Sequence, residues 1–412
     1  MGKYALRCLE CNAELTFEKF RFKCQEHNAL VRSIYSKKRI TFRDLPGIWK
    51  FYDWLPVEGA SEYEGRSITY KSEGLAKELG LENLFISFSG YWPERGGLIQ
   101  TCTFKELEAI ATLQYAAGCK TRLVIASAGN TANAFAYIGS TQKFPVILVV
   151  PKKCLCDIWV PELDTSLVKT IIIEDGDYSD AISLAEKLSR REGLTYEGGA
   201  RNIARRDGLA TVLLDAVRIM KELPGHYFQA IGSGTGAIAT LESGLRLLGD
   251  GRFGEALPKF HLSQNLPFIP MVRAWKEGRR KITREEMPKE NVLDIVYARV
   301  LTNRYPPYSV RGGVYDALQS TKGKTYGITN EEAKEASRFF KEQEGIDILP
   351  AAAVAVASLI KAIEVGEVGL KDKILLNVTG GGKKRLKEDI TLQELKADIS
   401  INKDTPVGDI DI

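Results

Sequence analysis

Short apolar runs alternate with amphipathic segments along most of the chain after about residue 110. The runs are rich in β-branched residues, as is typical of strands buried in a parallel sheet: Leu123–Ala126, Val146–Val150, Ile171–Ile173, Phe228–Ile231 and Ile374–Val378. Between them, helical spacing of apolar residues predicts helices over 181–188, 210–223 and 331–340. This order of strands and helices predicts an open α/β architecture with right-handed crossovers.

Two segments depart from this alternation. Ala351–Ile360 is apolar on nearly every side and is bounded by Asp347 and Lys361, which predicts a buried helix. It is shorter than the roughly 20 apolar residues that a membrane-spanning helix needs. Residues 251–289 contain prolines and clustered Arg and Lys, and we expect an insertion or an irregular connection there.

Length and charge narrow the range of functions. A chain of 412 residues predicts two or three packed units. The balance of 57 Lys and Arg against 53 Asp and Glu leaves a net charge of only +4, so we expect no nucleic-acid partner, although small anions remain candidates. The start, MGKYALRCLECN, lacks an apolar leader, and we expect a cytoplasmic protein without a membrane partner. With histidines only at positions 27, 226 and 261, a Ser-His-Asp triad is not expected.

Three cysteines and one histidine have metal-ligand spacing near the N-terminus. The pattern is C-x2-C followed, after a gap, by C-x2-H, and its members are Cys8, Cys11, Cys24 and His27. Two such pairs suit tetrahedral zinc, and four protein ligands leave no open position for catalysis. We therefore expect a structural zinc site, with thiols that hold no metal as the alternative.

A glycine-rich turn follows the strand-like segment HYFQAI and precedes the helical AIATLESGLRLL. Backbone N–H groups in such a turn can converge on a phosphate at the start of a helix, and the turn consists of Gly232, Ser233, Gly234, Thr235 and Gly236. The turn and the alanine after it also satisfy the dinucleotide pattern G-x-G-x-x-A, so a nicotinamide-dependent oxidoreductase is an alternative. That alternative requires an acid after the next strand, and none follows Lys259–Ser263. A phosphate cup fits better.

Three further residues have a functional and a structural interpretation. Asn130 follows a predicted strand, where its amide could contact a ligand or simply cap a helix. Lys105 stands in the first turn of a predicted helix, where the dipole disfavours a cation. A Schiff-base lysine removes that conflict, although a surface lysine is the commoner explanation of a single lysine. Thr379 follows a strand and precedes three glycines, which suits close approach of a ligand or a simple turn.

Lysine, asparagine loop, glycine cup and C-terminal threonine occur in the order used to bind pyridoxal phosphate on an α/β frame. Over nearly all residues after about 45, the chain resembles the fold-type II pyridoxal-phosphate enzymes, the threonine synthase and tryptophan synthase β group. Within that group it most resembles the cysteate synthases of methanogenic archaea. The stretches that match best are FSGYWPERGG, TCTFKELEA, SAGNTANAFA, EGGARNIARRDG, YFQAIGSGTGAIA, LTNRYPPYSVRGG, EGIDILP and TGGGKKRLKED.

The resemblance implies a tryptophan synthase β-like fold with two open α/β domains and a small N-terminal segment. It divides the chain into a zinc-ribbon-like segment at 1–40 and a catalytic region at 41–412. We expect a smaller lobe inserted at about 110–220 and a larger lobe from 41–109 plus 221–412. Members of this fold type are commonly homo-oligomers, so the resemblance also implies a homo-oligomer.

The resemblance also implies roles for the four sites. Lys105 would hold pyridoxal phosphate covalently and Asn130 would contact its 3'-oxygen. The turn Gly232–Gly236 would cradle its phosphate and Thr379 would meet the pyridine nitrogen. The implied reaction is O-phospho-L-serine plus sulfite giving L-cysteate and phosphate, a step in coenzyme M biosynthesis. Lys105 would remove the α-proton.

Three other functions remain as alternatives. Threonine synthase is the first, but it usually has Asp and Ser where this chain has Glu106 and Thr103. The second is the nicotinamide-dependent oxidoreductase, and the third is a non-catalytic zinc-ribbon adaptor.

Substrates that are small oxyanions require fixed cations. Arg201 and Arg205 are four residues apart and would share one face if their segment is helical. Arg95, together with Thr101 and Thr103 near the lysine, is a second candidate group. For both groups, solvated surface arginines are the alternative interpretation.

Overall fold

Two parallel sheets form the core of the computed structural model, which describes residues 2–15, 18–287 and 295–412. The larger sheet has six strands, in the order β15-β14-β13-β16-β5-β4, and only its edge strand β4 is antiparallel to its neighbour. The strands are β4 (Ile68–Lys71), β5 (Asn83–Phe88), β13 (His226–Ala230), β14 (Lys259–Asn265), β15 (Lys324–Ile328) and β16 (Lys373–Val378).

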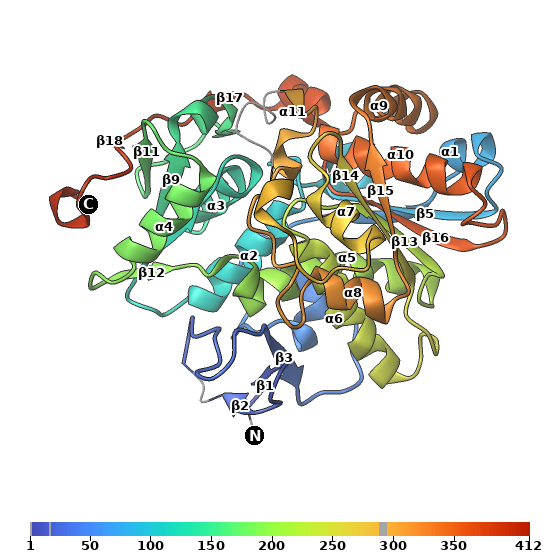
Figure 1. Ribbon diagram of the computed structural model, residues 1–412, viewed down its shortest axis with the longest axis horizontal. Helices are drawn as coiled ribbons and strands as arrows, with labels where there is room; N and C mark the ends of the chain where they lie inside the picture. The colour runs from blue at the N-terminus through green and yellow to red at the C-terminus, as the bar shows by residue number, and fades with distance from the viewer. Residues whose placement is uncertain (1, 16–17, 288–294) are drawn as a thin grey trace.

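The smaller sheet lies beside the larger one and is parallel throughout (Figure 1). Its order is β12-β8-β9-β11-β18, with β8 (Arg122–Ala126), β9 (Val146–Pro151), β11 (Val168–Ile173), β12 (Leu194–Tyr196) and β18 (Ile399–Ile401). Its central strands are apolar and buried, as expected for a sheet that helices cover on both faces.

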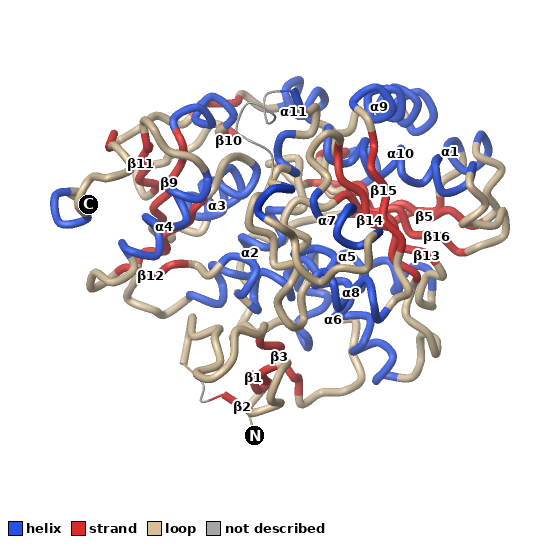
Figure 2. The backbone as a smooth tube through the Cα atoms, in the orientation of Figure 1, coloured by secondary structure: helices blue, strands red, loops and turns tan. Residues whose placement is uncertain are grey.

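Helices cover both sheets (Figure 2). The longer ones are α2 (Lys105–Ala116), α3 (Asn130–Thr141), α4 (Tyr178–Leu188), α5 (Ile203–Met220), α6 (Thr235–Asp250), α9 (Asn330–Glu344) and α10 (Pro350–Glu364). The shorter ones are α1 (Gly74–Glu78), α7 (Pro270–Lys276), α8 (Val314–Ser320) and α11 (Lys383–Asp389). Asp177 and Thr329 begin α4 and α9 with capping boxes, which satisfy backbone N–H groups that have no partner inside the helix.

A third, small sheet at the N-terminus pairs β1 (Tyr4–Cys8) with β2 (Glu14–Leu15) and β3 (Val31–Tyr35). It lies against the main body (Figure 1), and Leu30 N donates to Arg311 O at 2.9 Å. The remaining short strands form two ribbons: β6 (Tyr91–Trp92) with β7 (Gly97–Leu98), and β10 (Trp159–Pro161) with β17 (Leu392–Glu394). The second ribbon ties the C-terminal segment to the smaller lobe.

The alternation of parallel strands and helices is confirmed at the predicted places, and the apolar segment 351–360 is the buried middle of α10. Among the described helices, none is long and apolar enough to cross a membrane. The irregular connection expected at 251–289 is wrong for its middle, which forms β14 and α7. The strand-like run Lys259–Ser263 noted in the sequence is the main part of β14, and Gln264 Oε1 at its end accepts from Met271 N in α7 at 2.9 Å. Residues 288 and 289 lie outside the described part.

The structure also changes the expected division into lobes. Strand β18 pairs in parallel with β11, so residues 399–401 belong to the smaller sheet although the division assigned 221–412 to the larger lobe. The short sequence of β18, ISI, does not reveal its partner, because strand pairing over such a distance depends on how the chain returns.

Candidate active site

A cavity of about 1180 Å³ lies where strands of both sheets reach their carboxyl ends. Ser127 to Thr131 enter it after β8, the glycine turn enters it after β13, and Thr379 enters it after β16. Open α/β sheets place their ligands at this end of the strands. The structure therefore brings together Lys105, Asn130, the turn at 232–236 and Thr379, which the sequence alone left scattered.

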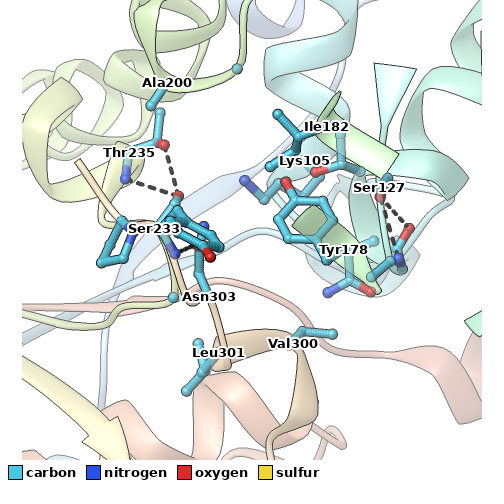
Figure 3. A pocket seen from close by; sticks show the side chains of 18 of the residues that line it. Lys105, Ser127, Tyr178, Ile182, Ala200, Ser233, Thr235, Val300, Leu301 and Asn303 are labelled. Carbon is cyan, nitrogen blue, oxygen red and sulfur yellow. Dashed lines mark hydrogen bonds between the residues drawn. The ribbon is translucent and has the colours of Figure 1, made fainter. Parts of the chain in front are cut away.

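Lys105 is the first residue of α2, and its side chain points into the cavity opposite Ser233 and Thr235 (Figure 3). Its side chain is 19% exposed, and its Nζ lies 3.0 Å from Glu108 Oε2. The amine is therefore accessible from the cavity and is not a surface lysine.

The glycine turn does not tolerate side chains at Gly232, Gly234 and Gly236. Gly234 adopts φ +78°, and a Cβ on Gly232 would lie 2.9 Å from Val300 O. A Cβ on Gly236 would lie 2.7 Å from Gln229 Nε2. The turn opens α6, so backbone N–H groups and the helix dipole are directed toward an anion placed there.

Thr379 is held next to the start of α2 by backbone pairing. Phe104 N donates to Thr379 O at 3.0 Å, and Gly381 N donates to Cys102 O at 3.1 Å. A Cβ on Gly380 would approach Cys102 O to 2.6 Å, so glycine is required for this close packing. The contact places Thr379 beside the lysine-bearing segment despite their distance in sequence.

Asn130 is the first residue of α3 and lines the cavity. Ser127 caps this helix instead, because its Oγ accepts from Ala132 N at 2.9 Å and from Gly129 N at 3.3 Å. Within the described residues, no hydrogen bond engages the Asn130 side chain, so its amide remains available to a ligand. The interpretation of Asn130 as a plain helix cap is therefore wrong.

These residues fit pyridoxal phosphate. The amine at Lys105 is of the type that condenses with an aldehyde, and the turn offers a phosphate cradle that side chains would fill. A buried hydroxyl also faces the cavity, since Thr103 lines it and its Oγ1 has no hydrogen-bond partner among the described residues.

The two arginines near residue 200 both line the cavity but do not share a helical face. Arg201 lies in a 3-10 turn before α5 begins, and it donates to Ala29 O at 3.1 Å and to the side-chain oxygen of Asn28. Arg205 lies in α5, where Glu197 Oε1 is 2.7 Å from its Nη2. The condition for one shared helical face is therefore not met, because Asn202 caps α5 between the two arginines.

Arg95 does not belong to the described cavity lining. Its guanidinium stacks on Tyr70 and Trp92, with centroid distances of 4.6 Å and 4.7 Å. Thr101 is buried, and its backbone N–H donates to Glu106 at 2.7 Å. Of this second predicted group, only Thr103 lines the cavity.

Two charged residues near the lysine were not singled out from the sequence. Glu108 is fully buried one turn after Lys105, and Lys383 lines the cavity four residues after Thr379. Burial lowers the pKa of Lys383, whose ammonium lies 4.4 Å from the ring centre of Trp159. An acidic residue one helical turn from the lysine is the signal that would have found Glu108.

Glu106 supports the opposite side of the lysine segment. Burial raises its pKa to about 7, although hydrogen bonds from the Tyr63 hydroxyl and the Thr101 backbone oppose the shift. It does not line the cavity. We therefore assign it to the framework of the site and not to ligand contact.

The predicted zinc ligands do come together. The Sγ atoms of Cys8, Cys11 and Cys24 and a ring nitrogen of His27 all lie within 4.8 Å of one another. Cys11 Sγ is 3.9 Å from Cys24 Sγ, and Cys24 Sγ is 3.8 Å from His27 Nδ1. Three thiols and one imidazole in this arrangement are compatible with tetrahedral zinc.

Comparisons with known proteins agree with this geometry. The family described as pyridoxal-phosphate dependent enzyme matches residues 60–380. A protein of Methanosarcina acetivorans named cysteate synthase is 50% identical over 100% of both chains. A protein of the same name from Methanosarcina barkeri is 52% identical over 96% of each chain.

Solved structures with the same fold are much more distant in sequence. Maize serine racemase aligns with a TM-score of 0.58 and 14% identity, over 78% of this chain and 90% of that chain. Threonine deaminase from Solanum lycopersicum aligns with a TM-score of 0.58 and 17% identity, over 78% and 87%. The expected fold class is confirmed.

Proposed function

The chain belongs to the pyridoxal-phosphate-dependent enzymes, among the cysteate synthases, and we propose that it converts O-phospho-L-serine and sulfite into L-cysteate and phosphate. The observation that carries this proposal is identity of about half of all positions over the full length of curated cysteate synthases. These relatives come from methanogens, which supports a role in coenzyme M biosynthesis. Threonine synthase is not favoured, because the relatives that share about half of their residues with this chain are named cysteate synthase.

We assign the cofactor to the residues that meet at the cavity. Lys105 would join its aldehyde, the turn at 232–236 would hold its phosphate, Asn130 would contact its 3'-oxygen and Thr379 would face its ring nitrogen. When bound, pyridoxal phosphate supplies an electron sink for the charge left at the substrate α-carbon. A neutral hydroxyl at Thr379 favours loss of a β-substituent over transamination, because it leaves the ring nitrogen largely unprotonated.

The chain's own residues would do the remaining work. Lys105 Nζ would take the α-proton and return it after the exchange at the β-carbon. Cations would hold the departing phosphate and the incoming sulfite. For this role we propose Arg201 and Lys383, since Arg205 already has Glu197 as its partner. Thr103 offers a hydroxyl on the same wall.

The remaining proposals concern the state of the protein. We propose that Cys8, Cys11, Cys24 and His27 hold a structural zinc ion. We also propose that the enzyme is cytoplasmic and forms homo-oligomers, as is common for this fold type.

The decisive experiment incubates the purified protein with pyridoxal phosphate, O-phospho-L-serine and sulfite. We expect cysteate and phosphate in equal amounts, measured by mass spectrometry and a phosphate assay. Omitting sulfite should abolish cysteate. Formation of threonine from O-phosphohomoserine, with no cysteate from phosphoserine, would overturn the proposal in favour of threonine synthase.

A further inference from the structure

Glu108 is a buried carboxylate that touches the reactive amine, and the proposed function gives it no task. Its side chain has no exposed surface, and its Oε2 lies 3.0 Å from Lys105 Nζ. The two residues are one helical turn apart on α2, so the rigid helix sets the distance between them. The carboxylate is therefore already in position, whatever enters the cavity.

The other oxygen of Glu108 is held from two sides. Thr131 Oγ1 donates to Glu108 Oε1 at 3.2 Å, and Arg205 Nη1 lies 3.6 Å from the same atom. Thr131 is on α3 and Arg205 is on α5, so three helices converge on this carboxylate. The hydroxyl donor and the arginine compensate the buried carboxylate for its lost contact with water.

Arg205 in turn pairs with a second carboxylate, that of Glu197. Its Nη2 lies 2.7 Å from Glu197 Oε1, and both side chains are almost fully buried. Burial would lower the pKa of Arg205, but Glu108 and Glu197 raise it, so the arginine stays charged. Burial raises the pKa of Glu197, a shift that Arg205 opposes. The phenols of Tyr178 and Tyr196 also act on this cluster. Burial raises the pKa of both, that of Tyr178 to about 12.

This arrangement pairs two cations with two carboxylates: Lys105 and Arg205 with Glu108 and Glu197. The neighbouring Glu106 is equally buried but faces away, toward Tyr63 and the backbone N–H of Thr101. Two glutamates in one turn of α2 therefore have different partners, and only one of them contacts the lysine.

We propose that Glu108 is a positioning residue for Lys105, which holds the amine in the cavity whenever that amine is free and protonated. This inference deepens the proposed function and in part rests on it. In the reaction, the α-carbon loses its proton to Lys105 Nζ, the new N–H bond forms as the C–H bond breaks, and the electron pair stays with the substrate. Glu108 accepts a hydrogen bond from the resulting ammonium until the proton is returned.

The test uses the full chain stripped of cofactor and compares wild type with Glu108→Gln. At about pH 7, covalent uptake of pyridoxal phosphate is followed by visible absorbance, and turnover is measured after saturation with cofactor. We expect uptake to become about fivefold faster, because the ion pair with the carboxylate no longer has to break before the amine attacks the aldehyde. We expect kcat to fall about tenfold, because the ammonium formed in turnover has lost its partner. A purely structural role would slow both processes.

Two further variants keep the test decisive. Glu108→Asp shortens the side chain by one methylene and moves the carboxylate away from the amine. It should also give faster uptake and lower kcat, both to a smaller extent, and it keeps the test valid if Glu108→Gln folds poorly. Glu106→Gln removes an equally buried carboxylate that does not contact Lys105, and it should leave uptake unchanged. Unchanged uptake in both Glu108 variants, or slower uptake together with slower turnover, would overturn the proposal. Uptake does not depend on the amino-acid substrate, so failure of the wild type to make cysteate would refute only the proposed reaction.

Discussion

The cavity and the N-terminal Cys/His cluster use polar groups in opposite ways. In the cluster, four ligand atoms lie within 4.8 Å of one another and face inward, which leaves no open position. In the cavity, an amine, an amide and a threonine hydroxyl border about 1180 Å³ of space. The comparison shows that a closed ligand set suits a structural ion, whereas groups directed at open space suit a reaction.

The two regions nevertheless share a wall. Residues 20–23, between the second and third cysteines, line the cavity. Phe22 packs closely on Gly198, and a Cβ on that glycine would lie 2.9 Å from the phenyl ring. Arg201, on the same wall, donates to Ala29 O at 3.1 Å, two residues after His27. We therefore expect changes in the cluster to affect substrate binding more than the chemistry.

Replacing Lys105 should have the largest effect, because it should abolish the chemistry in the cavity and leave the Cys/His cluster intact. Lys105→Ala should remove the visible absorbance of bound cofactor and lower turnover by about a thousandfold or more, because the covalent link and the base are lost. Any bound zinc should remain, measured by atomic absorption. Lys105→Arg, which keeps a positive charge beside Glu108, should be equally inactive. Retention of the absorbance band in either variant would remove the lysine assignment.

Glu106 should make the framework of the cavity sensitive to pH. Its folded pKa of about 7 exceeds the ordinary value of 4.5, so the folded protein keeps a proton that the unfolded chain releases. This proton contributes its full stabilisation of the fold below about pH 4.5. As the pH rises from there through 7, the free energy of unfolding falls by about 3 kcal/mol. Urea unfolding at several pH values should show this slope in the wild type but not in Glu106→Gln. An identical slope in both would contradict the prediction.

The glycine cradle should be sensitive to one methyl group. Gly234→Ala introduces a side chain at φ +78° and against Val314 Cγ2, at an expected cost of about 2 kcal/mol. Cofactor affinity should fall as well, because the turn must shift. Gly249→Ala is a matched control in the same helix, since a Cβ there meets nothing within 4 Å. Equal melting temperatures and cofactor affinities for the two variants would argue against a preformed cradle.

Disrupting the cluster should have the smallest effect on turnover. Cys24→Ser should lower the zinc content and raise KM for the oxyanion substrates about threefold through the shared wall, with kcat nearly unchanged. Cys156→Ser, an exposed thiol outside the cluster, serves as the control. A large loss of kcat with unchanged KM would show that the cluster takes part in the chemistry.

Much of the site could be predicted because its residues stand where strands end and helices begin. Lys105, Asn130, Gly234 and Thr379 each stand at the start of a helix or the end of a strand, and the carboxyl ends of parallel strands meet at one edge of a sheet. Their roles toward the cofactor stay predictions. Arg95 was misjudged because closeness to the lysine in sequence does not determine where a side chain points, and this one stacks on Trp92.

The local pattern of apolar residues, glycines and cysteines determined the α/β alternation, the family resemblance and the metal-ligand set. The α/β alternation depends on neighbours only a few residues apart, whose spacing sets strand and helix periods directly. Helical spacing alone puts Glu108 one turn from Lys105. Only the tertiary structure decided that Glu106 faces the backbone N–H of Thr101 and that Arg205 pairs with Glu197. Which partner a buried charge finds depends on the packing of helices far apart in sequence, and no local period encodes that choice.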